Sequence, residues 1–321
     1  MTRLDKVKFG VFLPFYTFKD AVDPASLFAK LKSIVQECER LGYHSTWLDD
    51  HLMFRNAQML ECWTTLSALA ASTRRIRLGT MVTCNGFRNP ALLAKMSATV
   101  DVISGGRLEF GLGAGVQEDE HEAYGFPFPA ASIRVQRLEE SLEIITKLWT
   151  QEKATYTGKQ YRISGAACEP KTIQKPHPPI TVGGNGERHL LKATAKYADR
   201  FDFGYQSTLE KYKHKLQVLK SHCESAGRAF SDIEKSCWPA GQILIAKDQR
   251  MLEMKIRKLK TPGQSRENFE NGNFVGTPDS VYALLQPYFD LGVTQFMLLF
   301  MDLPDMAGLR QFARAVDIAS C

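Results

Sequence analysis

The 321-residue sequence predicts a single (β/α)8 barrel, in which eight parallel strands close into a cylinder inside a ring of helices. Short apolar segments alternate with amphipathic segments eight times along the chain. The apolar segments are nearly continuous, as parallel strands covered on both faces should be. The rival fold, a doubly wound open sheet, would place a glycine fingerprint after the first strand, and the sequence has none there.

The first half of the chain provides four strand-and-helix units. Asp23 and Pro24 supply an N-cap and a first-turn proline for the first helix, and Gly42 ends it. Apolar residues at helical spacing predict a long helix that includes Leu138 and Trp149. The expected strands are 8–13, 44–48, 76–83 and 107–113, and further helices are expected at about 62–73 and after Asn89-Pro90.

The second half predicts four more units and two insertions into the one domain, 1–321. The expected strands are 180–182, 200–203, 242–246 and 294–300. The expected helices begin at about 187, cover about 208–226, open at Gly276-Thr277-Pro278-Asp279, and run last to about 319. One insertion, near 154–179, contains a hairpin in YTGKQYRI. The other, near 248–272, is charged and poorly patterned, and we expect a second insertion or a lid there.

Composition narrows the classes of partner. The net charge is +6, and Lys and Arg are spread along the chain. The densest run, KIRKLK at 255–260, is typical of one solvated helix face, so no nucleic-acid partner is expected. Seven cysteines without a CxxC pair favour reduced thiols and a cytoplasmic location. No segment approaches the ~20 apolar residues of a membrane span, and the N-terminus lacks a signal-peptide cleavage region.

Polar and glycine residues gather after the expected strands. In a barrel the chemistry lies at the carboxyl ends of the strands, so these residues should surround one pocket. They are Asp49, Asp50 and His51 after the second strand, Met81, Val82, Thr83 and Asn85 after the third, Gly113, Ala114, Gly115, Gln117, Glu118 and Glu120 after the fourth, Gly183, Gly184, Asn185 and Gly186 after the fifth, and Gly204 and Tyr205 after the sixth.

Each group also has a purely structural interpretation. An aspartate and a histidine at a strand end can cap a turn or pair with an arginine, and Gly113–Gly115 can be turn glycines. GGNG before a helix is a stronger signal, because it lets backbone N–H groups approach an anion, although a plain tight turn is the alternative. We expect five further histidines to lie on the surface or directly behind the residues of the site: His121, His177, His189, His214 and His222.

The sequence contains no metal-binding pattern and no nucleophile motif. It has no HExxH, no His or Cys pairs at ligand spacing, and no GxSxG. An anion cradle and a histidine without an obvious nucleophile indicate that a bound cofactor supplies the chemistry.

Several segments, in order along nearly the whole chain, resemble one family. They are GYHSTWLDDHL, IRLGTMVT followed by FRNPALLAK, SGGRLEFGLGAG, AYGFPFP, LEESLEII, KPHPPITVGGNGERHLLK and VGTPDSV. Together they resemble the luciferase-like monooxygenase superfamily, and within it most closely the branch that uses the deazaflavin coenzyme F420. The alternative cofactor in this superfamily is FMN.

The resemblance implies a TIM-like barrel of the bacterial luciferase type with an insertion, usually a homodimer, with a flavin-type ring across the barrel mouth. A bulge matching Met81-Val82, often with a non-prolyl cis peptide, would back the ring. The Asp-His pair matches Asp50-His51, and the phosphate-binding glycines match 183–186. The expected cofactor-binding residues are Asp50, Met81, Val82, Asn85, Gly113, Ala114, Gly115, Gly183, Gly184, Asn185 and Gly186.

The leading hypothesis is hydride transfer between coenzyme F420 and a small organic substrate. His51 would donate or accept the proton, because imidazole titrates near pH ~6.5, and Asp50 would position His51 or bind the cofactor. Val116 stands where the F420-dependent sugar-phosphate dehydrogenases carry an acid, which argues against sugar-phosphate oxidation. The alternatives are an FMN-dependent monooxygenase using reduced flavin and oxygen, and a flavin-binding barrel without turnover.

Overall fold

The computed structural model describes residues 7–13, 23–54, 57–204, 208–238, 241–271, 273–316 and 318. Eight parallel strands form a closed barrel, because β3 pairs with β5 as well as with β2. The strands are β1 Lys8–Phe12, β2 Ser45–Leu48, β3 Arg77–Thr80, β5 Leu108–Gly113, β8 Ile180–Gly183, β9 Arg200–Asp202, β10 Glu234–Cys237 and β13 Gln295–Leu298. The predicted (β/α)8 barrel is confirmed.

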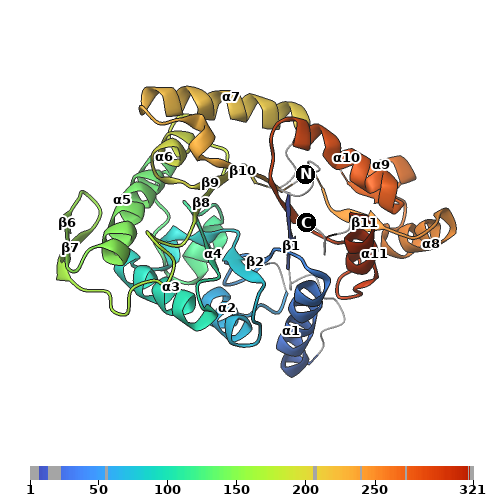
Figure 1. Ribbon diagram of the computed structural model, residues 1–321, viewed down its shortest axis with the longest axis horizontal. Helices are drawn as coiled ribbons and strands as arrows, with labels where there is room; N and C mark the ends of the chain where they lie inside the picture. Colours follow the sequence, from blue (N-terminus) through green and yellow to red (C-terminus); the bar gives the residue numbers. More distant parts are fainter. Residues whose placement is uncertain are drawn as a thin grey trace.

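Helices form a ring around the strands (Figure 1). They are α1 Pro24–Leu41, α2 Cys62–Ala71, α3 Pro90–Ser104, α5 Ala131–Thr150, α6 Leu190–Tyr197, α7 Leu209–Ser225, α10 Pro278–Asp290 and α11 Ala307–Ala315. A short helix, α4 Glu118–Ala123, follows β5, and a 3-10 turn, η3 Asn85–Phe87, precedes α3. No helix within the described ranges is long and apolar enough to cross a bilayer.

The predicted helix ends of α1 are confirmed. The Asp23 side chain accepts a hydrogen bond from the Ala25 N–H at 3.0 Å, and Pro24 takes the first helical position. Gly42 ends the helix with a φ of 90°, a left-handed conformation that glycine adopts without steric cost. The expected end of the last helix near 319 and the expected site residue Tyr205 lie outside the described residues.

The seventh strand was predicted at the wrong segment. We expected it at 242–246, but β10 completes the barrel and Ile243–Ile245 (β11) pairs with β12, Phe274–Gly276, outside it. The sequence of β10 is EKSC, which looks polar because its first side chain, Glu234, belongs to a buried ion network. The apolar ILI segment, Ile243–Ile245, fits the hydrophobic pattern of a barrel strand better, although it lies outside the barrel.

Two segments interrupt the β/α alternation. The hairpin expected within 154–179 is present as β6 Ala154–Thr157 and β7 Arg162–Ala166, at the left edge of Figure 1. The stretch 248–272 contains α8 Gln249–Leu259 and α9 Arg266–Glu270, at the right edge. The solvated face expected at 255–260 is wrong for Lys255, whose Nζ lies 2.6 Å from the Asp302 carboxylate.

The amino ends of the strands are closed by charged side chains that point inward. Arg77 pairs with Glu109, and Glu109 also accepts from Arg200 at 2.7 Å. Arg200 binds Glu234 at 2.7 Å, and Lys8 binds the same carboxylate at 2.8 Å. Each charge of this network has an opposite partner, which a buried charge requires.

Above this ion network the barrel interior becomes apolar. Phe12, Trp47, Met81, Met297 and Leu299 form one buried cluster, against which Val82 and Trp238 pack. Side chains alternate between the two faces of a strand, so the residues of this cluster point inward while their neighbours face the helices. The cluster forms the floor on which a pocket at the carboxyl ends can rest.

Candidate functional site

One cavity opens at the carboxyl ends of the strands, and about 230 Å³ of it is accessible to a water-sized molecule. The lining residues are Asp49, Asp50, His51, Met81, Val82, Thr83, Cys84, Gly113, Ala114, Gly115, Val116, Gln117, Glu120, His121, Gly183, Gly184, Asp202, Gly204 and Trp238. Nine of the predicted site residues are among them, whereas Asn85, Asn185 and Gly186 are not.

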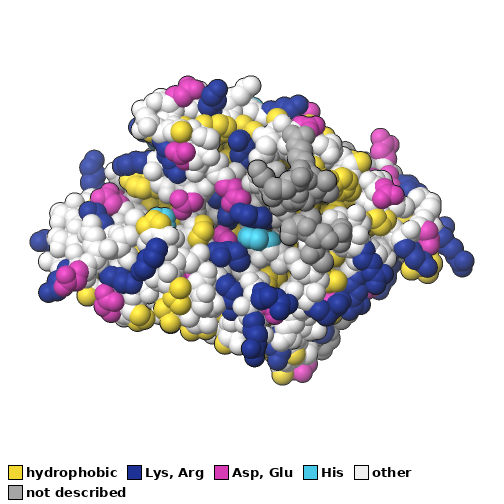
Figure 2. All heavy atoms as spheres, in the orientation of Figure 1, with side chains coloured by type: hydrophobic (Ala, Val, Ile, Leu, Met, Phe, Trp, Pro, Cys, Tyr) yellow, Lys and Arg dark blue, Asp and Glu magenta, His cyan; other side chains and the backbone are white. Residues whose placement is uncertain are grey.

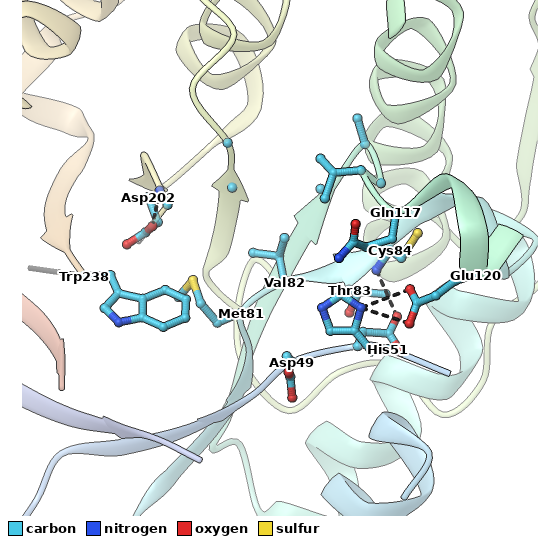
Figure 3. Close-up of a pocket in the computed structure, with 18 of the residues that line it drawn as sticks. Asp49, His51, Met81, Val82, Thr83, Cys84, Gln117, Glu120, Asp202 and Trp238 are labelled. Carbon is cyan, nitrogen blue, oxygen red and sulfur yellow. Dashed lines mark hydrogen bonds and ion pairs between the residues drawn. The ribbon is translucent and has the colours of Figure 1, made fainter. Parts of the chain in front are cut away.

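His51 is held by a buried carboxylate. Its Nδ1 lies 3.0 and 3.1 Å from the two carboxyl oxygens of Glu120, which is 2% exposed (Figure 3). The Met53 N–H also donates to Glu120. Because a carboxylate only accepts hydrogen bonds, Nδ1 carries the proton and Nε2 is the acceptor of the neutral ring. His51 is therefore oriented to take up or deliver a proton through Nε2.

Asp50 has a different partner from the one expected. Its carboxylate accepts from Arg88 at 2.5 and 2.9 Å and from the Cys84 N–H at 2.9 Å. The contact that orients His51 thus belongs to Glu120, and Asp50 pairs with an arginine, which was the structural alternative for this aspartate. Its predicted contact with a cofactor stays a prediction.

The chain breaks strand geometry between β3 and β4, Thr83–Cys84, where the Met81–Val82 peptide is cis. The Val82 side chain lies against two of the predicted site glycines. A Cβ on Gly113 would stand 2.6 Å from Val82 Cγ2, and one on Gly183 would stand 2.7 Å from Val82 Cγ1. Real Cβ atoms do not approach carbon so closely, so both positions require glycine for packing.

The GGNG loop is less open than the predicted anion cradle. Gly184 has a φ of 128°, and its N–H already donates to the Asp202 carbonyl at 2.8 Å. The following helix, α6, begins only at Leu190, beyond the expected start near 187. The N–H groups left for an anion are therefore those of the next loop residues, Asn185 and Gly186, and not that of Gly184.

His121 lies inside the site, so its expected position outside the site is wrong. It is buried on α4, with Nδ1 2.6 Å from the Gln117 carbonyl and Nε2 3.7 Å from Cys84 Sγ. Burial raises the pKa of Cys84 to about 12, so the thiol stays protonated and is a poor nucleophile at neutral pH. No motif in the sequence links positions 84 and 121, because the fold alone joins the ends of β4 and α4.

Two further carboxyl groups lie at the cavity without full pairing. Both oxygens of Asp49 and the Oδ2 of Asp202 are buried and have no hydrogen-bond partner among the described residues. Burial raises the pKa of Asp49 to about 7 and that of Asp202 to about 6. In the described chain, no Lys or Arg side chain lines the cavity.

Comparisons with known proteins find one matching family model and relatives that carry enzyme names. Residues 7–273 match the family model described as luciferase-like monooxygenase. An F420-dependent glucose-6-phosphate dehydrogenase of Amycolatopsis mediterranei is 31% identical over 62% of this chain and 60% of its own length. The enzyme of the same name from Microbacterium testaceum is 34% identical over 61% and 59%. The aligned part thus spans about three fifths of these curated relatives.

Other relatives carry flavin names. The oxygenase component of flavin-dependent trigonelline monooxygenase from Acinetobacter baylyi is 26% identical over 71% of this chain and 62% of its own length. Among solved structures, an F420-dependent secondary alcohol dehydrogenase with an F420–acetone adduct superposes with a TM-score of 0.79 at 19% identity, covering 98% of this chain and 99% of that one. Monooxygenase RslO1 from Streptomyces bottropensis gives 0.79 at 23% identity, covering 98% and 97%. These two likenesses show the fold.

Proposed function

The chain belongs to the luciferase-like monooxygenase family, and on that premise we propose that it transfers a hydride between coenzyme F420 and a small organic substrate. The observation that carries this proposal is His51, a solvent-reaching imidazole held by the buried Glu120 at the cavity. The F420-dependent names of the curated relatives support the choice of cofactor.

The chemistry divides between cofactor and chain. When bound, the deazaflavin accepts or gives the hydride. If the substrate is an alcohol, its hydroxyl proton passes to Nε2 of His51 as the hydride leaves the adjoining carbon. The resulting imidazolium is stabilised by the Glu120 carboxylate, which holds Nδ1 without accepting the proton. In the reverse direction His51 returns the proton to the carbonyl oxygen.

The cavity fits a flat, largely apolar ring. Met81, Val82 and Trp238 offer apolar surface, and the unpaired Asp49 offers hydrogen bonds. We propose that these residues hold the ring and that the loop 183–186 holds the phosphate. Gly113, Ala114 and Gly115 also line the cavity and would contact the ring. Asn85 does not line the cavity and would support the residues that do.

The cavity argues against a sugar phosphate as the substrate. Val116, 80% exposed, occupies the place where the sugar-phosphate dehydrogenases carry an acid. A sugar phosphate would bring a second phosphate beside that of the cofactor, and no described Lys or Arg lines the cavity to pair with it. We therefore infer an uncharged or cationic substrate for this chain.

The second candidate function is an FMN-dependent monooxygenase, which the monooxygenase names of several relatives favour. Titration of the purified chain with coenzyme F420 and with FMN, followed by fluorescence, separates the two. We expect tighter binding of F420. Preference for FMN without deazaflavin binding would overturn the leading proposal.

We also propose a homodimer in the cytoplasm. The outer surface of α3 exposes Leu92 (56%) and Ile103 (46%), which lie eleven residues and so about three turns apart on one face. Figure 2 shows hydrophobic side chains on the surface over this helix. The six described cysteines are free and buried, as expected for a reducing compartment.

A further inference from the structure

Asp49 occupies a position that the fold alone does not explain. It follows β2 and continues the inward side of that strand, which includes Trp47 of the barrel floor. Only 5% of the residue is exposed, and neither carboxyl oxygen has a hydrogen-bond partner among the described residues. Burying a carboxyl group without a partner is unfavourable, so a bound ligand is the natural source of the missing contacts.

The other acidic residues of the cavity are already engaged. Asp50 accepts from Arg88, Glu120 from His51, and Asp202 from the Gly204 N–H by one oxygen. Arg88 is in turn bound by Asp50 and by Glu61. No described cation at the cavity is therefore left to pair with Asp49, and the partner must come from the ligand.

The protonation of Asp49 determines which ligand groups suit it. Burial raises its pKa to about 7, His51 and the backbone N–H of Asp49 itself act in the opposite direction, and Asp50 and Glu120 raise it further. His121 and Asp202 line the same cavity. Near neutral pH a large share of Asp49 is thus an uncharged carboxyl, with an O–H donor beside a carbonyl acceptor. An imide edge, with an N–H beside a carbonyl, is its complement.

We propose that the Asp49 carboxyl binds the imide edge of the cofactor ring, accepting a hydrogen bond from the ring N–H and donating one to the neighbouring ring carbonyl. The inference rests on the proposed function only in requiring a ring with such an edge. FMN and coenzyme F420 both carry it, so the contact does not depend on which of them binds.

The arrangement of strands supports this orientation. In the closed barrel β2 and β8 are three strands apart through β3 and β5, that is, on nearly opposite sides of an eight-stranded ring. The proposed phosphate loop follows β8, and Asp49 follows β2. A cofactor with its phosphate at that loop therefore extends across the mouth toward Asp49.

The test compares FMN with N3-methyl-FMN, which lacks the imide N–H. Both are titrated by fluorescence into the cofactor-free full chain, at pH 6 and pH 8. The variants are Asp49→Asn, which keeps a donor beside an acceptor, and Asp49→Leu, which keeps neither. Asp101→Asn is the matched control, because Asp101 is a buried aspartate on α3 that binds Gln174 away from the cavity.

We expect the wild type and Asp101→Asn to prefer FMN by about tenfold at pH 6, as a lost pair of neutral hydrogen bonds implies. FMN affinity should fall at pH 8, where the carboxylate cannot donate to the ring carbonyl, whereas the preference over N3-methyl-FMN should remain, because the carboxylate still accepts from the ring N–H. Asp49→Asn should bind FMN with the same affinity at both pH values, and Asp49→Leu should lose the preference.

An equal penalty for N3-methylation in the wild type and in Asp49→Leu would overturn the inference. So would unchanged FMN affinity in Asp49→Leu together with a changed substrate KM, which assigns Asp49 to the substrate. If the leucine variant is insoluble, an identical pH dependence of FMN affinity in the wild type and in Asp49→Asn would also overturn the inference. Asp49-dependent FMN binding without F420 binding would overturn only the proposed function, and binding of neither ring would overturn both.

Discussion

At the scale of single residues, the proposed reaction depends on the His51 imidazole and on the Glu120 carboxylate that holds it. Glu120 reaches His51 from a short helix 69 positions later in the chain, so only the closed barrel brings the two together. The sequence places Glu120 after the fourth strand, but nothing in its spacing links it to the histidine. Asp50, the neighbour of His51 in the chain, faces Arg88 because successive side chains point to opposite sides.

His51→Asn should lower turnover by ~10²-fold or more, because amide nitrogen cannot replace imidazole as acid or base. The fold and the cofactor affinity should persist, since the proposed phosphate loop, 183–186, follows β8 on the other side of the barrel. Steady-state kinetics measure the turnover, and fluorescence titration measures the cofactor affinity. Turnover equal to that of the wild type would return His51 to a structural role.

Glu120→Gln should lower turnover by about tenfold, because the imidazolium that forms on His51 loses the carboxylate that holds Nδ1. A positioning role predicts that kcat falls while KM changes little, and steady-state kinetics measure both. Glu118→Gln, an exposed neighbour on α4, is the control and should leave kcat unchanged. Unchanged kcat in Glu120→Gln would remove the positioning role.

At the scale of elements, the turn between β3 and β4 restricts which residues fit at the ends of the neighbouring strands β5 and β8. Val82 fills the space above Gly113 and Gly183, so two glycines that resemble a ligand cradle are explained by packing between strands. The sequence cannot separate these two reasons for glycine, because both demand the absence of a Cβ.

Gly113→Ala should destabilise the chain by about 1–3 kcal/mol, since its Cβ would overlap Val82. Val82→Ala in the same chain removes the obstructing methyl groups and should restore part of the loss. Thermal unfolding of the wild type, both single variants and the double variant gives the coupling directly. Additive effects of the two substitutions would mean that Val82 does not determine the requirement at Gly113.

The hydrophobic pattern predicts where helices and strands lie along the chain better than it predicts which side chains they bring together. It locates α1, α3 and seven of the barrel strands, because caps and apolar runs are local signals. It fails at β10, where an inward Glu234 belongs to the ion network and makes a barrel strand read as polar. It fails again at His121, whose burial depends on α4 folding over β4. Both failures concern side chains whose partners are distant in sequence.

At the scale of the whole molecule, the barrel has two unlike ends and an outer surface of helices. The amino ends are closed by paired charges, and the carboxyl ends carry the cavity. On the outside, α3 leaves an apolar strip that a single copy does not cover.

Leu92→Glu with Ile103→Lys should convert the proposed dimer into a monomer. Charged side chains in an apolar interface would have to be buried without matched partners. Sedimentation or light scattering at several concentrations measures the change. Exchanging two exposed residues on another helix, Lys220→Glu and Glu224→Lys on α7, serves as the control. A dimer that survives the α3 exchange would place the interface elsewhere.

The charges that close the lower end of the barrel have a kinetic consequence. In the described part of the chain, the paired network and the Trp47 cluster above it close this end of the barrel, so cofactor and substrate would share the mouth at the carboxyl ends. If the ring lies on the floor, it must enter before the substrate, and the product must leave before the ring can be exchanged. The order of binding is then compulsory. Excess substrate that occupies the mouth would keep the reacted cofactor from leaving, and the turnover rate would fall.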